Sequence, residues 1–182
     1  MLIKKFIINS IFLIKNLYGL IFLTKEKKIS KILLEKHIKL SIAESCTGGL
    51  VSSRLTDVSG SSAYIFQNLV TYANEAKESL LRVNPETIKK YGAVSPETAK
   101  EMAEGLLNNY NCNLAAAITG IAGPSGGSRE KPAGLIYMAA ANKNKCEILM
   151  FQAPSFLDRR IMKYEFSNKL LDFLYEFMLR NY

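Results

Sequence analysis

Three small nucleophilic side chains and two glycines stand together in the stretch Ala43 to Gly49. An apolar run leads into this stretch and an amphipathic run leads out of it, which predicts a strand, a turn and a helix. Such a junction directs a side chain and several free backbone N–H groups at one point. That point suits a phosphate, a carboxylate or the oxyanion of a tetrahedral intermediate. A tight turn that simply needs glycine explains the stretch equally well. The residues concerned are Ser45, Cys46, Thr47, Gly48 and Gly49.

A serine or cysteine nucleophile in this chain needs a base other than histidine. The single histidine, His37, falls at the end of a predicted helix, where we expect a surface residue. A lysine can act as the base where desolvation or a neighbouring positive charge lowers its pKa from about 10.4 toward neutrality. Tyr72 and Lys77 bracket a predicted strand end and the first turn of the next helix, so both could face one pocket. A solvated surface lysine and a half-buried strand tyrosine are the commoner explanation of that spacing.

Composition limits the classes of function. The 182 residues are enough for one domain with its own core, and 48% hydrophobic with 22% charged residues is typical of a soluble protein. Cys46, Cys112 and Cys146 have neither metal-ligand spacing nor a disulfide pattern, which predicts a reducing, cytoplasmic location. The net charge of +8 comes from lysines spread along the chain, so it favours a small anionic substrate as much as a nucleic acid.

Residues 1–24 differ from the rest, because their only charges are Lys4, Lys5 and Lys15 among Ile, Leu, Phe and Asn. They could be a signal peptide or membrane anchor, an extra amphipathic helix, or a translated leader before the working start. Lys15 and Asn16 interrupt the apolar run, and no small-residue cleavage site follows. We therefore favour a non-essential extension over an anchor, followed by one domain over residues 25–182.

The remaining chain predicts alternating helices and strands that end in a hairpin. Strands are predicted at 38–43, 66–73, 114–119, 134–141 and 146–152. Helices are predicted at 25–37, 50–58, 75–81 (capped by Asn74) and 96–110, with a short helix that opens at Pro85 and a last one from about 156 onward. This order indicates an α/β fold, a three-layer α/β/α sandwich with a mixed, mostly parallel sheet. Ligands in such folds lie beyond the carboxyl ends of the strands. A second glycine-rich loop at 120–127 also follows a strand, so both loops can line one pocket.

Five stretches resemble, in order and spacing, the C-terminal domain family of the competence/damage-inducible protein CinA. They are residues 43–49, 60–62, 71–77, 92–95, and 119–127 together with 131–134. The resemblance runs from about Lys25 to the C-terminus, and the combination of motifs is highly specific. Stand-alone members of that family hydrolyse nicotinamide mononucleotide to nicotinate mononucleotide and ammonia in pyridine nucleotide salvage. The resemblance implies the same α/β/α fold, with no metal and no organic cofactor.

The resemblance also implies roles for individual residues. Ser45 would be the nucleophile, Lys77 the base and Tyr72 a proton relay. Substrate contacts would come from Cys46, Thr47, Gly48, Gly49, Thr119, Gly120, Gly123, Gly126, Gly127 and Arg159. Main-chain N–H groups near Cys46 to Gly48 would hold the oxyanion, and the loop at 120–127 would hold phosphate and ribose. The chain departs from the family pattern in the segment that contains Arg159 and, further on, Lys163.

Three alternatives accompany the amidohydrolase interpretation. A non-catalytic nucleotide-binding or competence-associated protein could use the same scaffold, although the presence of Ser45, Tyr72 and Lys77 together argues against it. A membrane-tethered interaction module depends only on residues 1–24. We expect nicotinamide mononucleotide as the substrate, a homo-oligomer as the assembly, no nucleic-acid partner and no membrane association. Thr47 or Cys46 as the nucleophile is the third alternative, and Cys46 is the weaker candidate because we expect it to pack as a small apolar group.

Overall fold

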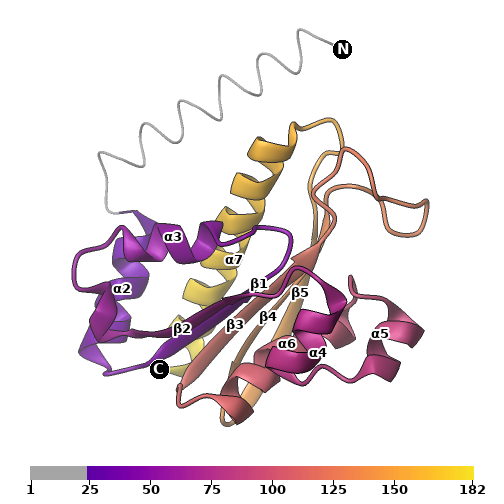
Figure 1. Cartoon of the computed structure of the whole chain (residues 1–182). Coiled ribbons are helices and arrows are strands. Elements are labelled where there is room, and N and C mark those ends of the chain that lie inside the picture. The colour runs from indigo at the N-terminus through magenta and orange to yellow at the C-terminus, as the bar shows by residue number, and fades with distance from the viewer. Residues whose placement is uncertain (1–23) are drawn as a thin grey trace, which may run out of the picture.

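A five-stranded mixed sheet forms the centre of the domain in the computed structural model, which describes residues 24–182 (Figure 1). The predictions for residues 1–23 fall outside the described part of the chain. The strand order across the sheet is β2-β1-β3-β4-β5. The strands are β1 (Leu40–Glu44), β2 (Ile65–Val70), β3 (Leu114–Gly120), β4 (Leu135–Asn142) and β5 (Lys145–Gln152).

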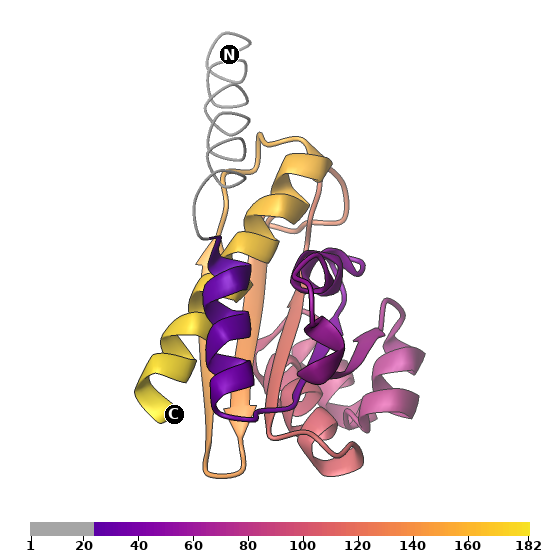
Figure 2. The same ribbon diagram turned by 90° about the vertical axis from the view of Figure 1, so that its left-hand side faces the viewer.

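Helices cover both faces of the sheet, as Figures 1 and 2 show from two sides. One apolar core joins the sheet to α2, α3 and α7, and a second joins the other face to α4, α5 and α6. The α-helices are α2 (Lys25–Glu35), α3 (Leu50–Thr56), α4 (Asn74–Leu81), α5 (Pro85–Tyr91), α6 (Pro96–Asn109) and α7 (Arg159–Asn181), with a 3₁₀ turn at Ser61–Ala63. The predicted three-layer α/β/α sandwich is confirmed.

Strand directions explain why the sheet is mixed. β1 pairs in parallel with β2 and with β3, whereas β4 pairs antiparallel with β3 and with β5. Two of the four pairings are thus parallel, and four of the five strands run in one direction. The closing hairpin must be antiparallel because two residues cannot carry the chain back for a parallel pair. Asn142 holds that turn, since its Oδ1 accepts from the N–H groups of Asn144 and Lys145 at 2.9 Å each.

Three predicted element boundaries are wrong at the edge of the sheet that carries the candidate site. β2 ends at Val70 and not at Ala73, because the carbonyls of residues 71–73 turn toward Lys77 Nζ. Ala73, not Asn74, is the N-cap of α4 and provides no side-chain hydrogen bond. α7 begins at Arg159 rather than near residue 156, because Asp158 has an extended backbone.

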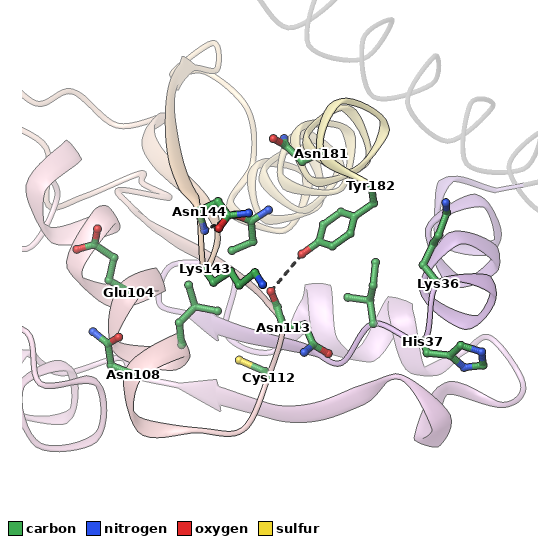
Figure 3. A pocket seen from close by; sticks show the side chains of 13 residues that line it. Lys36, His37, Glu104, Asn108, Cys112, Asn113, Lys143, Asn144, Asn181 and Tyr182 are labelled. Atoms are coloured by element: carbon green, nitrogen blue, oxygen red, sulfur yellow. Dashed lines mark hydrogen bonds between the residues drawn. The ribbon is translucent and has the colours of Figure 1, made fainter.

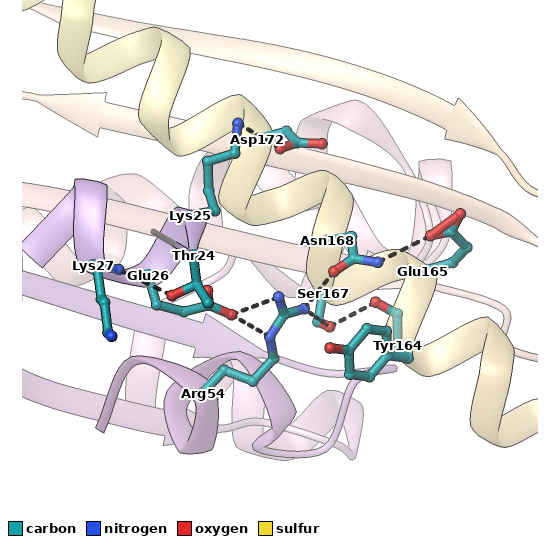
Figure 4. Close-up of polar contacts among 10 residues, drawn as sticks. All are labelled: Thr24, Lys25, Glu26, Lys27, Arg54, Tyr164, Glu165, Ser167, Asn168 and Asp172. Atoms are coloured by element: carbon teal, nitrogen blue, oxygen red, sulfur yellow. Dashed lines mark hydrogen bonds and ion pairs between the residues drawn. The ribbon is translucent and has the colours of Figure 1, made fainter. Parts of the chain in front are cut away.

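A buried ion-pair network joins the three helices on one face of the sheet (Figure 4). The Arg54 Nε of α3 donates to Glu26 Oε1 of α2 at 2.7 Å. Its Nη1 donates to Ser167 Oγ at 2.6 Å and to Asn168 Oδ1 at 2.7 Å, both on α7. The guanidinium also stacks on the Tyr164 ring, 4.6 Å from its centroid. Arg54 thus fixes α3, which follows the first glycine-rich loop, against α7.

Within residues 24–182, none of the helices combines the length and the apolar character that crossing a bilayer requires.

Candidate active site

The carboxyl ends of the three parallel strands meet at one edge of the sheet. The N–H of Ser45, just after β1, donates to the Ile118 carbonyl of β3 at 3.1 Å. The N–H of Thr71, just after β2, donates to the Glu44 carbonyl of β1 at 2.8 Å. These bonds extend the sheet one residue beyond the strands and hold the three following loops side by side. Both glycine-rich loops therefore lie at the edge where α/β folds bind ligands.

Ser45 and Lys77 make direct contact at this edge. Lys77 Nζ lies 3.3 Å from Ser45 Oγ, although the two residues are 32 positions apart in the chain. Three main-chain carbonyls surround the same nitrogen, at 2.8 Å (Thr71), 3.3 Å (Tyr72) and 3.5 Å (Ala73). A serine hydroxyl within hydrogen-bond reach of an amine is the arrangement that nucleophile activation requires.

Burial sets the protonation of Lys77, whose exposed fraction is 1%. Loss of solvation lowers the pKa of Lys77, and the Glu75 charge opposes the shift. Lysine is rarely buried without a counter-charge, because the ammonium loses its hydration. From the sequence, a solvated surface lysine is the commoner interpretation of Lys77. The structure instead places this side chain inside the protein against the Ser45 hydroxyl.

The Glu44 carboxylate shapes the loop that carries Ser45. Its oxygens accept from the N–H groups of Gly49, Val51 and Ser52 at 2.8–3.1 Å. This buried carboxylate thereby occupies the amino end of α3 that the sequence offered to a ligand anion. The sequence alone does not single out Glu44, because a capping partner that comes from the preceding strand is visible only in three dimensions.

The turn at Ser45 limits which N–H groups can hold an oxyanion. The N–H of Gly48 donates to the Ser45 carbonyl at 3.1 Å, so it is not available as the sequence predicted. Gly48 has a φ of +61°, a left-handed conformation that favours glycine. In the described part of the chain, the N–H groups of Cys46 and Thr47 donate to no backbone acceptor. These two groups are the donors that remain for an oxyanion near Ser45.

Two further side chains of the same loop, Cys46 and Thr47, are buried. Burial raises the pKa of the Cys46 thiol to about 12, so this side chain is a neutral thiol at physiological pH. The expectation that Cys46 packs as a small apolar group agrees with this. Thr47 Oγ1 is buried and has no hydrogen-bond partner among residues 24–182. An unpaired buried hydroxyl is costly, and one beside a nucleophile is a candidate substrate contact.

Tyr72 and Arg159 form a separate contact at the edge of the site. The Arg159 Nη2 donates to Tyr72 Oη at 2.8 Å, and its Nη1 donates to the Gly123 carbonyl at 2.7 Å. The Tyr72 side chain is 60% exposed. Lys77 is bonded to the main-chain carbonyl of Tyr72 and not to its phenol. Arg159 thus joins the end of β2 to the second glycine-rich loop, and the phenol of Tyr72 is held there.

Close packing explains part of the second glycine-rich loop. A Cβ on Gly120 would lie 2.4 Å from Ile136 Cγ2, and one on Gly127 would lie 2.7 Å from the Ala133 nitrogen. Thr119 Oγ1 donates to the Ala93 carbonyl at 2.7 Å. These predicted contact residues therefore have structural reasons to be present. A Cβ on Gly126, in contrast, would have no atom within 4 Å.

A further cation lies over the first glycine-rich loop. Lys163 Nζ is 3.3 Å from the position that a Cβ on Gly48 would take. Lys163 follows Arg159 by one helical turn of α7, so both cations can face the site. Lys131 does not join them, because its Nζ donates to the carbonyls of Tyr91 and of Val94, the latter at 2.7 Å. The arrangement of Lys163 was not predicted, although its spacing from Arg159 was visible in the sequence.

A large cavity lies at the other end of the parallel strands, where β1 and β3 begin, and contains none of these residues (Figure 3). Its volume is about 810 Å³. The Asn113 Oδ1 accepts from the Lys39 N–H at 2.8 Å, and the Tyr182 phenol donates to the Asn113 carbonyl at 3.1 Å. Asn113 and Tyr182 are thus engaged in hydrogen bonds that join chain segments. Within residues 24–182 no group of three or more His, Cys, Asp or Glu side chains is placed to hold a metal.

The fold and the site together define a class of protein: a three-layer α/β/α domain with a buried serine–lysine pair at the carboxyl edge of its sheet. The sequence profile of the CinA C-terminal domain matches residues 23–178. The chain therefore belongs to the CinA C-terminal domain family.

Curated relatives and solved structures agree with this assignment. A CinA-like protein of Geobacter sulfurreducens is 48% identical over 129 residues, which is 71% of this chain and 31% of that protein. A CinA-like protein of Chlorobaculum tepidum is 45% identical over 151 residues, which is 81% of this chain and 36% of that protein. The chain thus spans about a third of the length of these relatives.

Solved structures match over nearly their whole length. The competence/damage inducible protein CihA of Agrobacterium tumefaciens superposes with a TM-score of 0.76 at 38% identity, covering 82% of this chain and 93% of that one. The competence damage-inducible protein A of Klebsiella pneumoniae gives a TM-score of 0.82 at 28% identity, covering 87% and 97%.

Proposed function

We propose that this protein is a metal-free amidohydrolase that converts nicotinamide mononucleotide to nicotinate mononucleotide and ammonia. The observation that carries the proposal is the 3.3 Å contact between Lys77 Nζ and Ser45 Oγ inside the protein. A buried lysine with a lowered pKa beside a serine is unusual for a structural residue and suits a catalytic base. The choice of nicotinamide mononucleotide as the substrate rests on the resemblance to stand-alone members of the family.

The carbonyls around Lys77 orient its lone pair in this mechanism. A neutral amine has two N–H groups and one lone pair. The carbonyls of Thr71 and Tyr72 accept the two N–H groups, which leaves the lone pair for the Ser45 hydroxyl. Ser45 Oγ then attacks the carboxamide carbon while its proton moves to Lys77. The same carbonyls stabilise the ammonium that forms.

The second half of the reaction releases ammonia and then water regenerates the serine. The N–H groups of Cys46 and Thr47 stabilise the oxyanion, where one lost donor typically costs about 3–4 kcal/mol. Lys77 returns its proton to the leaving nitrogen, the C–N bond breaks, and an acyl-serine remains. Water attacks that ester and gives a proton to Lys77. Lys77 then passes this proton to Ser45 Oγ as the ester bond breaks. Ammonia and the free acid are the products.

Arg159 and Lys163 bind the phosphate of the nucleotide in this proposal. Both cations are on the first turns of α7, and Lys163 lies over the loop that carries Ser45. Tyr72 remains the proposed proton relay, which requires its phenol to leave Arg159 for the Ser45–Lys77 pair. Phosphate binding at Arg159 would weaken the contact that holds the phenol.

Ammonia release from nicotinamide mononucleotide by the purified chain tests the proposal. We expect the Ser45→Ala variant to lose ammonia release while keeping the thermal unfolding curve of the native protein, because it removes only the nucleophile. Ser53→Ala, an exposed serine on α3, is the matched control and should keep full activity. Near-normal turnover by Ser45→Ala would contradict the assignment. Nucleotide binding without ammonia release by the native chain would instead select a non-catalytic nucleotide-binding protein.

The reaction also fits a cytoplasmic location, which we propose because all three cysteines are free thiols.

A further inference from the structure

Glu44 places a buried negative charge directly behind the first glycine-rich loop. Its side chain is fully buried, and its oxygens accept from the N–H groups of Gly49, Val51 and Ser52 and from the Ser52 hydroxyl. Each of these partners is a donor, which is the pattern of an ionised carboxylate. Among residues 24–182, no lysine, arginine or histidine forms an ion pair with Glu44. The charge is therefore held by N–H dipoles and is not cancelled by a cation.

The amino end of α3 offsets only part of this charge. A helix end is equivalent to about half an elementary charge, and α3 has only seven residues. A net negative potential therefore remains at the loop of Ser45. The neighbouring thiol is affected by it: burial is the main cause of the raised pKa of Cys46, about 12, and the Glu44 charge contributes to the same rise. Lys77 and Arg159 act in the opposite direction.

Glu44 and Ser45 point to opposite faces of the sheet. Side chains alternate along a strand, and Ile42 packs in the core shared with α3 and α7 whereas Ala43 packs in the core on the α6 side. Glu44 accordingly bonds to α3, and Ser45 contacts Lys77 of α4. The carboxylate thus acts on the Ser45 hydroxyl across roughly 7–9 Å of protein. It can influence which charge binds at Ser45 without touching a ligand.

We propose that Glu44 is a specificity-determining residue that makes the site at Ser45 favour a neutral carboxamide over a carboxylate. This inference rests on the proposed function, in which the product differs from the substrate only by a carboxylate in place of the carboxamide. Both nucleotides carry the phosphate, so Arg159 and Lys163 attract the two equally. The Glu44 charge opposes only the product carboxylate. It thereby offsets the attraction of the Lys77 ammonium for that carboxylate and promotes release of the product.

The tetrahedral oxyanion is also negative, but its surroundings differ from those of the product. It is covalently bound to Ser45, so it cannot dissociate, and it forms together with the Lys77 ammonium. In the proposed mechanism the N–H groups of Cys46 and Thr47 donate to its single charged oxygen. The free product has no such bond and spreads its charge over two oxygens. Of the three ligands that a strand–turn–helix junction suits, Glu44 therefore disfavours a phosphate and a carboxylate and leaves the transient oxyanion.

Binding of substrate and product to the full-length Ser45→Ala chain tests the inference, because this variant keeps the site without turnover. Isothermal titration calorimetry at pH 8 gives a Kd for nicotinamide mononucleotide and one for nicotinate mononucleotide. We expect the amide to bind more tightly than the acid. Adding Glu44→Gln should shift the ratio of the two Kd values roughly five- to tenfold toward the acid. Any distortion of the loop by glutamine affects both ligands and cancels in this ratio.

Two further variants separate charge from structure in the same Ser45→Ala background. Ser52→Ala removes the hydroxyl that donates to Glu44 but keeps the carboxylate, so the Kd ratio should not change. Glu44→Asp keeps the charge and should retain most of the discrimination. In the chain with Ser45 intact, Glu44→Gln should strengthen inhibition of ammonia release by nicotinate mononucleotide, relative to KM, by the same factor. The ratio in Ser45→Ala alone tests the inference even where Glu44→Gln does not fold.

The inference is overturned by any of three results. One is that Ser45→Ala binds the acid as tightly as the amide or more tightly. Another is a Kd ratio that Glu44→Gln leaves unchanged, or that Ser52→Ala shifts as much, which would give Glu44 a purely structural role. The third is that neither nucleotide binds, which would also reject the proposed substrate. Failure of the proposed reaction alone looks different: the native chain would release no ammonia, while the Kd ratio would still respond to Glu44→Gln.

Discussion

Lys77 is the residue on which the proposed chemistry depends, and its surroundings act in opposite directions. Burial favours the neutral amine, whereas three nearby carbonyls and the Glu75 charge favour the ammonium. A catalytic base needs this balance, because it must be neutral before the reaction and hold a proton during it. A pKa lowered from its ordinary value achieves both at a pH near neutrality.

The pH dependence of the rate follows from this lowered pKa. Since burial lowers the pKa of Lys77, the neutral fraction rises as the pH passes upward through that value, and ammonia release should rise and then level off. Lys77→Arg should be nearly as inactive as Lys77→Met, because a guanidinium stays protonated. Tyr72→Phe should keep more activity if the phenol only relays a proton. Initial rates between pH 5 and 10 for these variants measure the effect.

Stability of Lys77→Met is the control for a purely structural role. Between the lowered pKa and about 10.4, the unfolded state binds the proton that the native state lacks, so unfolding free energy rises with pH by up to about 1.4 kcal/mol per unit. Lys77→Met should lose this slope and be at least as stable at neutral pH. A Lys77→Arg enzyme with most of its activity would reject the serine–lysine mechanism and leave Lys77 as a phosphate contact.

At the scale of elements, the site depends on how α3 and α7 are held together. α3 follows the loop of Ser45, and α7 carries Arg159 and Lys163. Arg54 is bonded to Glu26, Ser167 and Asn168, so one guanidinium fixes three helices (Figure 4). A planar group with five donors suits this task, and an ammonium does not.

Arg54→Met should therefore destabilise the domain by about 3–5 kcal/mol, because it leaves the Glu26 carboxylate buried without its partner. Urea unfolding measures this loss. The stability of Arg54→Lys should fall between those of Arg54→Met and the native protein, since a lysine can approach Glu26 but cannot bind all three acceptors. Arg129→Met, an exposed arginine, is the control and should change stability by less than about 0.5 kcal/mol. Equal stability of both Met variants would show that the network is dispensable.

At the scale of the whole molecule, the candidate site is assembled from residues between Glu44 and Lys163. Thr24 is the first residue that the structure describes, and its Oγ1 accepts from the Lys27 N–H at 3.4 Å. Lys25 forms an ion pair with Asp172 at 2.9 Å, and Glu26 contacts Arg54. The boundary of the functional domain should therefore lie close to Thr24.

Two deletions test that boundary. Removal of residues 1–23 should leave ammonia release and the unfolding temperature unchanged, because no contact described at the site is lost. Removal of residues 1–26 also removes the cap and Glu26, and should lower the unfolding temperature by roughly 6–12 °C. An insoluble or inactive shorter deletion would mean that residues 1–23 belong to the fold. Membrane fractionation of the full chain would support the anchor interpretation.

The sequence by itself predicted the order of elements, the layers and the edge of the sheet that carries the site. Periodicity and turn residues are local signals, so the helices near Leu50 and Pro96 and the hairpin at 142–145 were visible without neighbours. Resemblance singled out Ser45 and Lys77 as a pair. Spacing alone could not identify this pair, because 32 residues separate Ser45 from Lys77 and most lysines are solvated.

Only the tertiary structure decided how the side chains around that pair are used. It placed the Glu44 carboxylate at the amino end of α3, turned the carbonyls of residues 71–73 toward Lys77, and held the Tyr72 phenol on Arg159. Each of these contacts joins residues from different elements across the sheet edge. Their energies depend on burial and distance, which a linear sequence does not contain and which packing of the three layers determines.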